Sequence, residues 1–162
     1  MSFQGKVDEF YRSNRQALFT CALSITRSVE AAEDAIQEAF YRIYRYDSWK
    51  VRNLKTFVFQ CVRNAAIDQL RKRPATESLD DVSLFDLNHH PRQVAMGRER
   101  EEALAAALES LDPDERQTIV EHLCGGLKFR EIADIRGIPQ GTVSAWYYRG
   151  LAKMKARLEE QP

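Results

Sequence analysis

The chain has 162 residues, and its 24 basic and 24 acidic side chains give a formal net charge of zero. This length holds one ordinary domain or two small ones, and it excludes a TIM barrel or a large multidomain enzyme. Apolar residues make up 44% of the chain, whereas Gly and Pro number only 7 and 5, so we expect an all-α fold rather than a β-sandwich or a disordered chain.

No apolar run is long enough to span a bilayer, and the N-terminus lacks the apolar core of a secretory signal. We therefore expect a cytoplasmic protein without membrane insertion. The three cysteines, Cys21, Cys61 and Cys124, lie far apart among apolar residues and are interpreted as buried free thiols. Only the adjacent His89 and His90 approach the spacing of metal ligands, so we expect neither a metal site nor another cofactor.

Three amphipathic helices are predicted in the first half of the chain. Apolar side chains recur at three- and four-residue steps over residues 7–27, 29–46 and 54–73, which is the period of a helix with one buried face. Pro74 ends the third helix. The segment that follows, to about residue 91, has turn-forming residues and scattered acids without a sustained period, and it is interpreted as a flexible linker.

Helical periodicity resumes near residue 93 and continues to residue 110. The sequence Asp112-Pro113-Asp114-Glu115 then predicts a new helix, because Asp is a good N-cap, Pro fits the first turn and Glu completes a capping box. Glycines at 125 and 126 predict the end of that helix.

The strongest motif of the second half is a helix-turn-helix. Ala133, Gly137 and Val143 have the spacing at which a small residue lets two helices approach, a glycine makes the turn and a valine anchors the second helix. Arg136 departs from this pattern, because an apolar residue is usual there, and Pro139 has no side-chain oxygen to cap the second helix. The motif predicts a helix that enters the major groove of DNA.

Charge is distributed unevenly along the chain. Residues 1–73 hold 13 basic and 8 acidic side chains, and residues 127–158 hold seven basic and two acidic side chains. Acidic residues elsewhere cancel this excess, so the zero total conceals two basic modules. A polyanion meets the local charge, and both modules are therefore expected to contact nucleic acid.

Two separated sets of motifs resemble the bacterial extracytoplasmic-function (ECF) sigma factors, group 4 of the sigma-70 family. The segments that resemble their region 2 are AEDAIQEAF at 32–40, LKTF at 54–57 and VRNAAIDQLRKR at 62–73. The segments that resemble their region 4 are EIA at 131–133, GIP at 137–139 and GTV at 141–143.

The resemblance implies a domain organisation and a function. Region 2, a helical bundle, would occupy residues 1–73, a linker that is helical in its second half would occupy 74–107, and region 4 would occupy 108–162. The chain is then an alternative sigma factor that binds core RNA polymerase and directs promoter-specific initiation. Region 2 would recognise and melt the minus-ten element of promoter DNA, and region 4 would read the minus-thirty-five element. An anti-sigma factor is the further partner implied, and the free protein is expected to be a monomer.

The resemblance also assigns residues to three surfaces. The positions that match the polymerase-binding stripe are Asp34, Gln37 and Glu38. The positions that match the minus-ten reader are Trp49, Lys50, Arg63, Asn64, Arg71, Lys72 and Arg73. The expected minus-thirty-five readers on the recognition helix are Gln140, Gly141, Thr142, Ser144, Ala145, Tyr148 and Arg149.

The chemistry of the minus-ten set suits a melted strand. Base stacking needs an exposed aromatic ring beside cations, which Trp49 and its basic neighbours offer unless Trp49 is a core residue instead. Asn64 matches the position that captures a flipped base, and its amide has both a donor and an acceptor. On the recognition helix, Ser144 and Ala145 stand where Arg or Lys is common in the family, which leaves the minus-thirty-five preference open.

The alternative function is a dimeric helix-turn-helix repressor or activator. Its N-terminal helices would form a ligand or dimer domain, and it would bind palindromic DNA without polymerase. No catalytic residue is assigned, because the sequence contains no P-loop, no nucleophile elbow and no HExxH motif.

Overall fold

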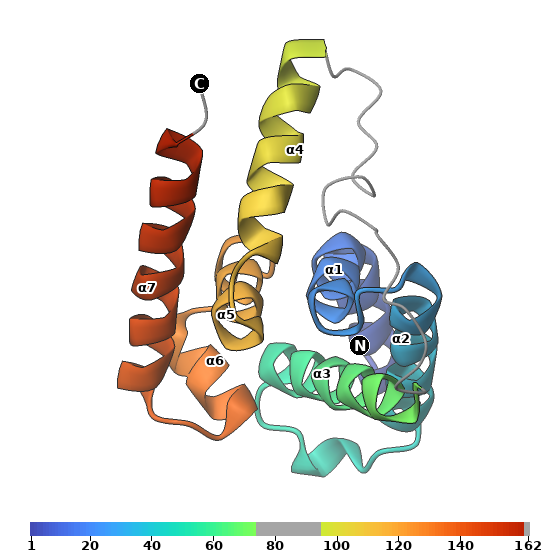
Figure 1. Ribbon diagram of the computed structural model, residues 1–162. Coiled ribbons are helices and arrows are strands. Elements are labelled where there is room, and N and C mark those ends of the chain that lie inside the picture. The colour runs from blue at the N-terminus through green and yellow to red at the C-terminus, as the bar shows by residue number, and fades with distance from the viewer. Residues whose placement is uncertain (74–94, 161–162) are drawn as a thin grey trace.

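The structure is a computed structural model that describes residues 1–73 and 95–160, and within these ranges it is all helical, as the composition predicts. The helices are α1 (Phe3–Thr26), α2 (Val29–Tyr44), the short 3-10 helix η1 (Ser48–Lys50), α3 (Leu54–Lys72), α4 (Ala95–Glu109), α5 (Pro113–Leu123), α6 (Phe129–Arg136) and α7 (Gln140–Glu159) (Figure 1). The predicted linker at 74–91 and the pair His89–His90 lie outside the described residues. None of the described helices has the length and apolarity needed to cross a membrane.

An N-terminal domain consists of α1, α2 and α3, each of which packs against the other two. Their amphipathic faces meet in a core whose members include Leu18, Leu23, Ile43, Val58 and Val62, all almost completely buried. Burying an aliphatic side chain of this size stabilises the fold by about 1.5–3 kcal/mol. The three-helix core predicted from the periodicity is therefore present.

Each helix of this domain begins at a side-chain cap. Ser2 accepts a hydrogen bond from the N–H of Gly5 at 3.0 Å, and Ser28 and Asn53 make the equivalent contacts three residues downstream at 3.3 and 3.2 Å. A cap of this kind contributes about 1 kcal/mol because it satisfies a backbone donor that has no partner inside the helix. The caps set where the helices start and hence the length of the loop before α3.

The C-terminal domain consists of α4, α5, α6 and α7, with α7 packed against the other three. The sequence-based boundary at 107/108 falls inside α4, which packs on α7. The predicted capping box is present: the Asp112 N–H donates to the Glu115 carboxylate at 3.2 Å. Helix α4 is thus part of the C-terminal domain.

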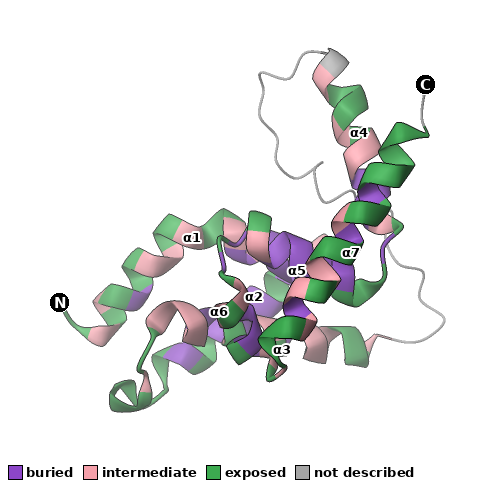
Figure 2. Ribbon diagram, turned by 90° about the vertical axis from the view of Figure 1, so that its left-hand side faces the viewer, coloured by how far each residue is buried: buried purple, intermediate pink, exposed green. Residues whose placement is uncertain are grey.

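The two domains touch, with α1 against α5 and α3 against α6. Burial is concentrated in the second half of α1 and along α5, which lie against each other (Figure 2). Gly125 permits this approach just after α5. A Cβ there would lie 2.6 Å from the backbone oxygen of Glu121 and 3.1 Å from Cys21 Sγ on α1.

Gly125→Ala should therefore lower the free energy of unfolding by about 1–3 kcal/mol, the usual cost of overpacking a tight site. Thermal unfolding followed by circular dichroism measures the effect. Gly97→Ala is the matched control, because nothing lies within 4 Å of a Cβ at that position on α4. That change should raise the stability by up to about 1 kcal/mol, since Ala is the better helix former. Equal effects of the two substitutions would contradict the close approach.

Candidate nucleic-acid and polymerase interface

The predicted polymerase-binding stripe lies along one side of α2. Asp34 and Gln37 are exposed, and Glu38 is partly buried. Glu38 accepts a hydrogen bond from the Arg42 guanidinium at 2.6 Å, one helical turn away. The stripe therefore offers the exposed carboxylate of Asp34, the amide of Gln37 and the carboxylate of Glu38, which is already paired with a cation. Arg45, whose guanidinium stacks over the Tyr41 ring at 4.2 Å, lies next along the helix.

The loop before α3 presents an aromatic side chain to solvent. Trp49, in η1, is 80% exposed, which excludes the reading of this residue as part of the core. The Lys50 ammonium lies 5.3 Å from the centre of its ring and 3.5 Å from the Asp47 carboxylate. Tyr46 packs on Phe57 of α3 with ring centres 4.8 Å apart, which holds the loop against the helix. The ring of Trp49 is thus available for stacking.

The predicted residues of α3 fall into two groups. Asn64, Arg71 and Lys72 are exposed. Arg73 instead donates to the carbonyl of Thr26 at 3.3 Å, and so helps to hold the end of α3 on α1. The fifth residue, Arg63, points away from solvent.

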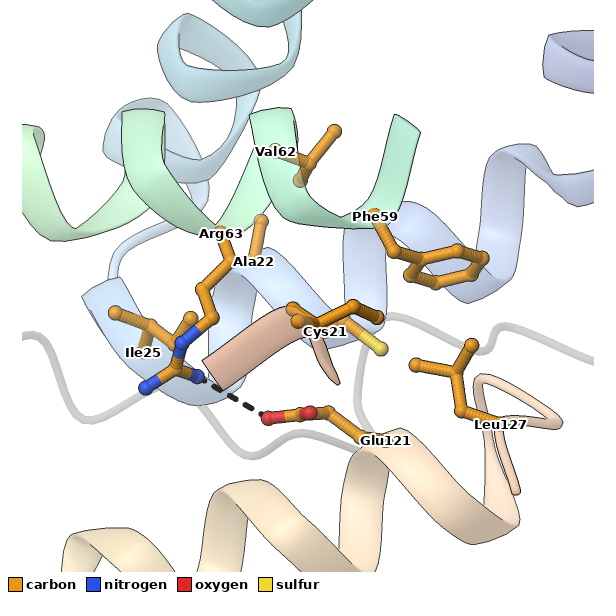
Figure 3. Close-up of a pocket in the computed structure, with 9 residues that line it drawn as sticks. Cys21, Ala22, Ile25, Phe59, Val62, Arg63, Glu121 and Leu127 are labelled. Atoms are coloured by element: carbon orange, nitrogen blue, oxygen red, sulfur yellow. Dashed lines mark hydrogen bonds and ion pairs between the residues drawn. The ribbon is translucent and has the colours of Figure 1, made fainter. Parts of the chain in front are cut away.

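Arg63 reaches across the domain boundary. Its Nη1 donates to Gln117 Oε1 and Glu121 Oε1 of α5, both at 3.1 Å, and its side chain is only 15% exposed. Figure 3 shows the contact between Arg63 and Glu121. Burial lowers the pKa of the Arg63 guanidinium, with the nearby cation Arg136 acting in the same direction. In this arrangement the Arg63 guanidinium is engaged with α5, whereas the resemblance assigned this residue to the minus-ten surface. Amphipathic periodicity placed it on a polar face but gave no sign that a second domain covers that face.

The helix-turn-helix is present in α6 and α7. Gly137 makes the turn with φ of 67°, a conformation that strongly favours glycine, and the N–H of Ile138 donates to the carbonyl of Ala133 at 3.1 Å. Ala133 and Val143 are buried between the helices, as the spacing predicts. Pro139 provides no side-chain cap.

Arg136, the residue that departs from the motif, is buried with its own set of partners. Its side chain is 5% exposed and donates to Asp114 Oδ1 at 2.6 Å and to Thr118 Oγ1 at 3.0 Å. Its guanidinium also lies 4.7 Å from the centre of the Trp146 ring. A charged side chain therefore replaces the usual apolar contact because α5 supplies a carboxylate and a hydroxyl to receive it.

The recognition helix α7 carries its predicted readers on the outer side. Those that are exposed are Gln140, Gly141, Ala145, Tyr148 and Arg149, whereas Thr142 and Ser144 are half-buried. The Ser144 hydroxyl donates to the carbonyl of Gly141 at 3.1 Å, so its hydrogen is engaged within the helix. Tyr148 packs edge-on against Phe129, which limits where its hydroxyl can point.

An apolar groove was not predicted from the sequence. It has a volume of about 570 Å³, lies between α4, α5 and α7, and is lined by Leu104, Leu108, Leu123, Leu151, Met154 and Leu158 among others. Leu123 and Leu158 are exposed along it. Each lining residue fits its own helix as an ordinary apolar position, so only the assembled domain reveals the groove.

The described residues contain no cluster of His, Cys, Asp or Glu that could hold a metal ion. All three thiols are free, but only Cys21 is buried. Cys61 is partly buried, and burial raises the pKa of its thiol to about 11. The expectation for Cys124 was wrong: it is exposed, because it follows the last turn of α5 beside the apolar groove.

Comparisons with known proteins agree on one family. The chain matches the family models for sigma-70 region 2 over residues 10–76 and sigma-70 region 4 over residues 101–154. It is 28% identical to the ECF RNA polymerase sigma factor SigM of Bacillus subtilis over 155 residues, 93% of each chain. It is 30% identical to SigW of the same organism over 146 residues, which cover 82% of this chain and 78% of the relative. The fold matches that of the sigma factor RpoE, solved in complex with the anti-sigma factor NepR from Bartonella quintana, with a TM-score of 0.68, 20% identity and coverage of 95% and 99%.

The environment of Arg136 predicts a stability effect. Arg136→Ala should lower the free energy of unfolding by about 1–3 kcal/mol, because Thr118 loses its donor at a buried site and the side chain leaves a void under Trp146. Arg130→Ala, which removes an exposed arginine from the same helix, should change it by less than about 0.5 kcal/mol. Chemical denaturation measures both variants. Similar values for the two would show that the buried contacts of Arg136 contribute nothing.

Proposed function

The chain belongs to the ECF sigma factors of the sigma-70 family, and we propose that it binds core RNA polymerase through α2 and promoter DNA through η1, α3 and α7. As a sigma factor it directs promoter-specific transcription initiation. The alternative of a dimeric repressor loses its basis, because the N-terminal helices that would form a ligand or dimer domain match sigma region 2. The name region 2 denotes helices α1–α3, and the name region 4 denotes helices α4–α7.

The observation that carries the proposal is the exposed set on the loop and α3: Trp49, Lys50, Asn64, Arg71 and Lys72. Promoter opening requires a surface that holds one strand single, since melted bases otherwise pair again. An exposed indole stacks on a base, cations meet the phosphates, and an amide recognises a base edge. This set provides all three kinds of contact on one domain.

Region 4 would read duplex DNA through the outer side of α7. Gln140 in the first turn has the amide that pairs with adenine, and Ala145 offers an apolar contact to a thymine methyl group. Arg149 is exposed and would bind a guanine or a phosphate. The first turns lack the arginine that gives the strongest base contact, so we expect modest discrimination at the minus-thirty-five element.

We also expect an anti-sigma partner. The support is that the sigma factor of similar fold was solved in complex with one. The apolar groove of region 4 suits the apolar face of an amphipathic helix, with Lys155 and Glu159 at its edge to pair with charges on that helix.

The polymerase assignment predicts a loss of core binding. Replacing Asp34, Gln37 and Glu38 together by alanine should weaken the affinity for core polymerase by about tenfold or more, which corresponds to a loss of about 1.4 kcal/mol. Titration of core with fluorescently labelled protein measures this. A control variant with Glu99→Ala and Glu102→Ala also loses two negative charges, but from exposed positions on α4. Unchanged affinity of the triple variant would reject the assignment, as would an equal loss in the control.

The strand-capture role predicts a defect in promoter opening. Asn64→Ala should reduce open-complex formation by about tenfold, the effect of losing one or two hydrogen bonds to a base. Bacterial core polymerase is reconstituted with the protein, and a promoter is selected from a library by its transcription. Strand opening on that promoter is then measured with a fluorescent base analogue in the minus-ten element. Binding of the closed upstream duplex should stay within about twofold of the original, since one removed amide on α3 leaves the region 4 contacts intact. Equal losses in both steps would argue against base capture.

A further inference from the structure

One buried arginine of the helix-turn-helix joins three helices. Arg136 is the last residue of α6, and its guanidinium donates to Asp114 Oδ1 at 2.6 Å and to Thr118 Oγ1 at 3.0 Å, both on α5. The guanidinium also lies 4.7 Å from the centre of the Trp146 ring on α7. A single side chain of α6 therefore contacts both α5 and the recognition helix.

We propose that Arg136 is a positioning residue for reading the minus-thirty-five element: it fixes the direction of the recognition helix relative to α5, and the discrimination between DNA sequences depends on that direction. Arg136 itself would not touch DNA, because its side chain is only 5% exposed. The proposal rests on the proposed function, since it takes α7 as the helix that reads the promoter. It deepens that function by naming a residue outside α7 that sets the specificity of α7.

The second half of α7 is anchored to α5 by contacts that do not involve Arg136. Gly150 lies so close to α5 that a Cβ there would be 2.6 Å from Ile119 Cδ1. One turn further on, the Lys153 ammonium donates to the buried Glu115 carboxylate at 2.8 Å. The expected readers, at 140–149, all precede this anchor. Their position relative to α5 therefore depends on what restrains the first half of α7.

A small tilt at the anchor becomes a large displacement at the start of the helix. A helix rises about 1.5 Å per residue, so Gln140 lies about 15 Å along the axis from Gly150, and a tilt of about 4° moves it by about 1 Å. Donor–acceptor distances in hydrogen bonds span only about 0.5 Å, so such a displacement breaks contacts to base edges. Attraction to phosphates depends mainly on charge and carries no sequence information. Loss of the restraint should therefore reduce discrimination more than general affinity for DNA.

Arg136 supplies a restraint between the anchor and the first turn. Trp146 lies one turn before Gly150, and its ring rests against a guanidinium that two hydrogen bonds hold on α5. A guanidinium is planar with a fixed fork of donors, so two acceptors and a ring define its position closely. Thr118 is fully buried and donates its own hydrogen to the carbonyl of Asp114 at 2.7 Å, which directs its oxygen lone pairs to Arg136.

The test breaks the contact from opposite sides. Arg136→Met keeps an unbranched side chain under Trp146 but removes both hydrogen bonds, and Asp114→Ala removes a carboxylate that is 55% exposed. Each variant is combined with bacterial core polymerase. Initiation is then measured on a promoter that the original protein selects from a library, and on the same promoter with a scrambled minus-thirty-five element.

The ratio of the two initiation rates should fall about fivefold in each variant, the lower end of the discrimination that one bidentate base contact provides. The rate on the scrambled promoter should stay within about twofold of the original, because contacts to phosphates remain. The double variant should lose no more discrimination than either single variant, since both changes break the same contact. Arg98→Met and Glu99→Ala are the matched controls, because they make the same kinds of change at exposed positions on α4. Neither control should change the ratio.

An unchanged ratio in Asp114→Ala would overturn the proposal, and this variant keeps the arginine in place even where Arg136→Met fails to fold. Equal losses on the selected and scrambled promoters would also overturn it, because a residue that only stabilises the fold lowers both rates together. Additive losses in the double variant would show that the two residues act separately. The absence of promoter-dependent transcripts from the original protein would instead reject the proposed function, and with it the reading role of α7.

Discussion

The packing of the two regions depends on the burial of one helix, α5, that carries several polar and charged side chains. Helix α5 lies between region 2 and the rest of region 4, and its buried side chains include Glu115, Arg116, Gln117, Thr118 and Glu121. A buried polar group without a partner costs about 1–3 kcal/mol, so the neighbouring helices must supply partners. Lys153 of α7, Ser24 of α1, Arg63 of α3 and Arg136 of α6 each provide one. These pairings orient all four helices around α5, and the packing of the two regions follows from them.

The same constraint explains what the sequence could predict. Periodicity and capping residues are local, and they predicted the bounds of α1 to α5 to within a few residues. The spacing of the helix-turn-helix motif predicted α6, α7 and the turn at Gly137, without bounds for the two helices. The recognition helix and its outward residues also followed from spacing within one motif. The family resemblance rested on short segments within each domain, so the family could be identified without knowing how the domains pack.

Contacts between distant segments could not be predicted in this way. Arg63 has the position of a surface residue on its own helix, and its burial follows only from an acid 58 residues away. Arg136 looked like a defect in the motif because its partners, Asp114 and Thr118, precede the motif in the chain. Exposure of Cys124 likewise depends on where α4 and α7 leave a groove. In each case a partner lies on another element, and amphipathic pattern carries no information about it.

The contrast between the two tryptophans has a spectroscopic consequence. The chain has only these two: Trp49, largely exposed on region 2, and Trp146, half-buried against the Arg136 guanidinium in region 4. Their indoles therefore sit in different dielectric surroundings and should emit at different wavelengths. An external quencher will reach the first far more readily than the second, so intrinsic emission can follow events on the two regions separately, without any attached dye.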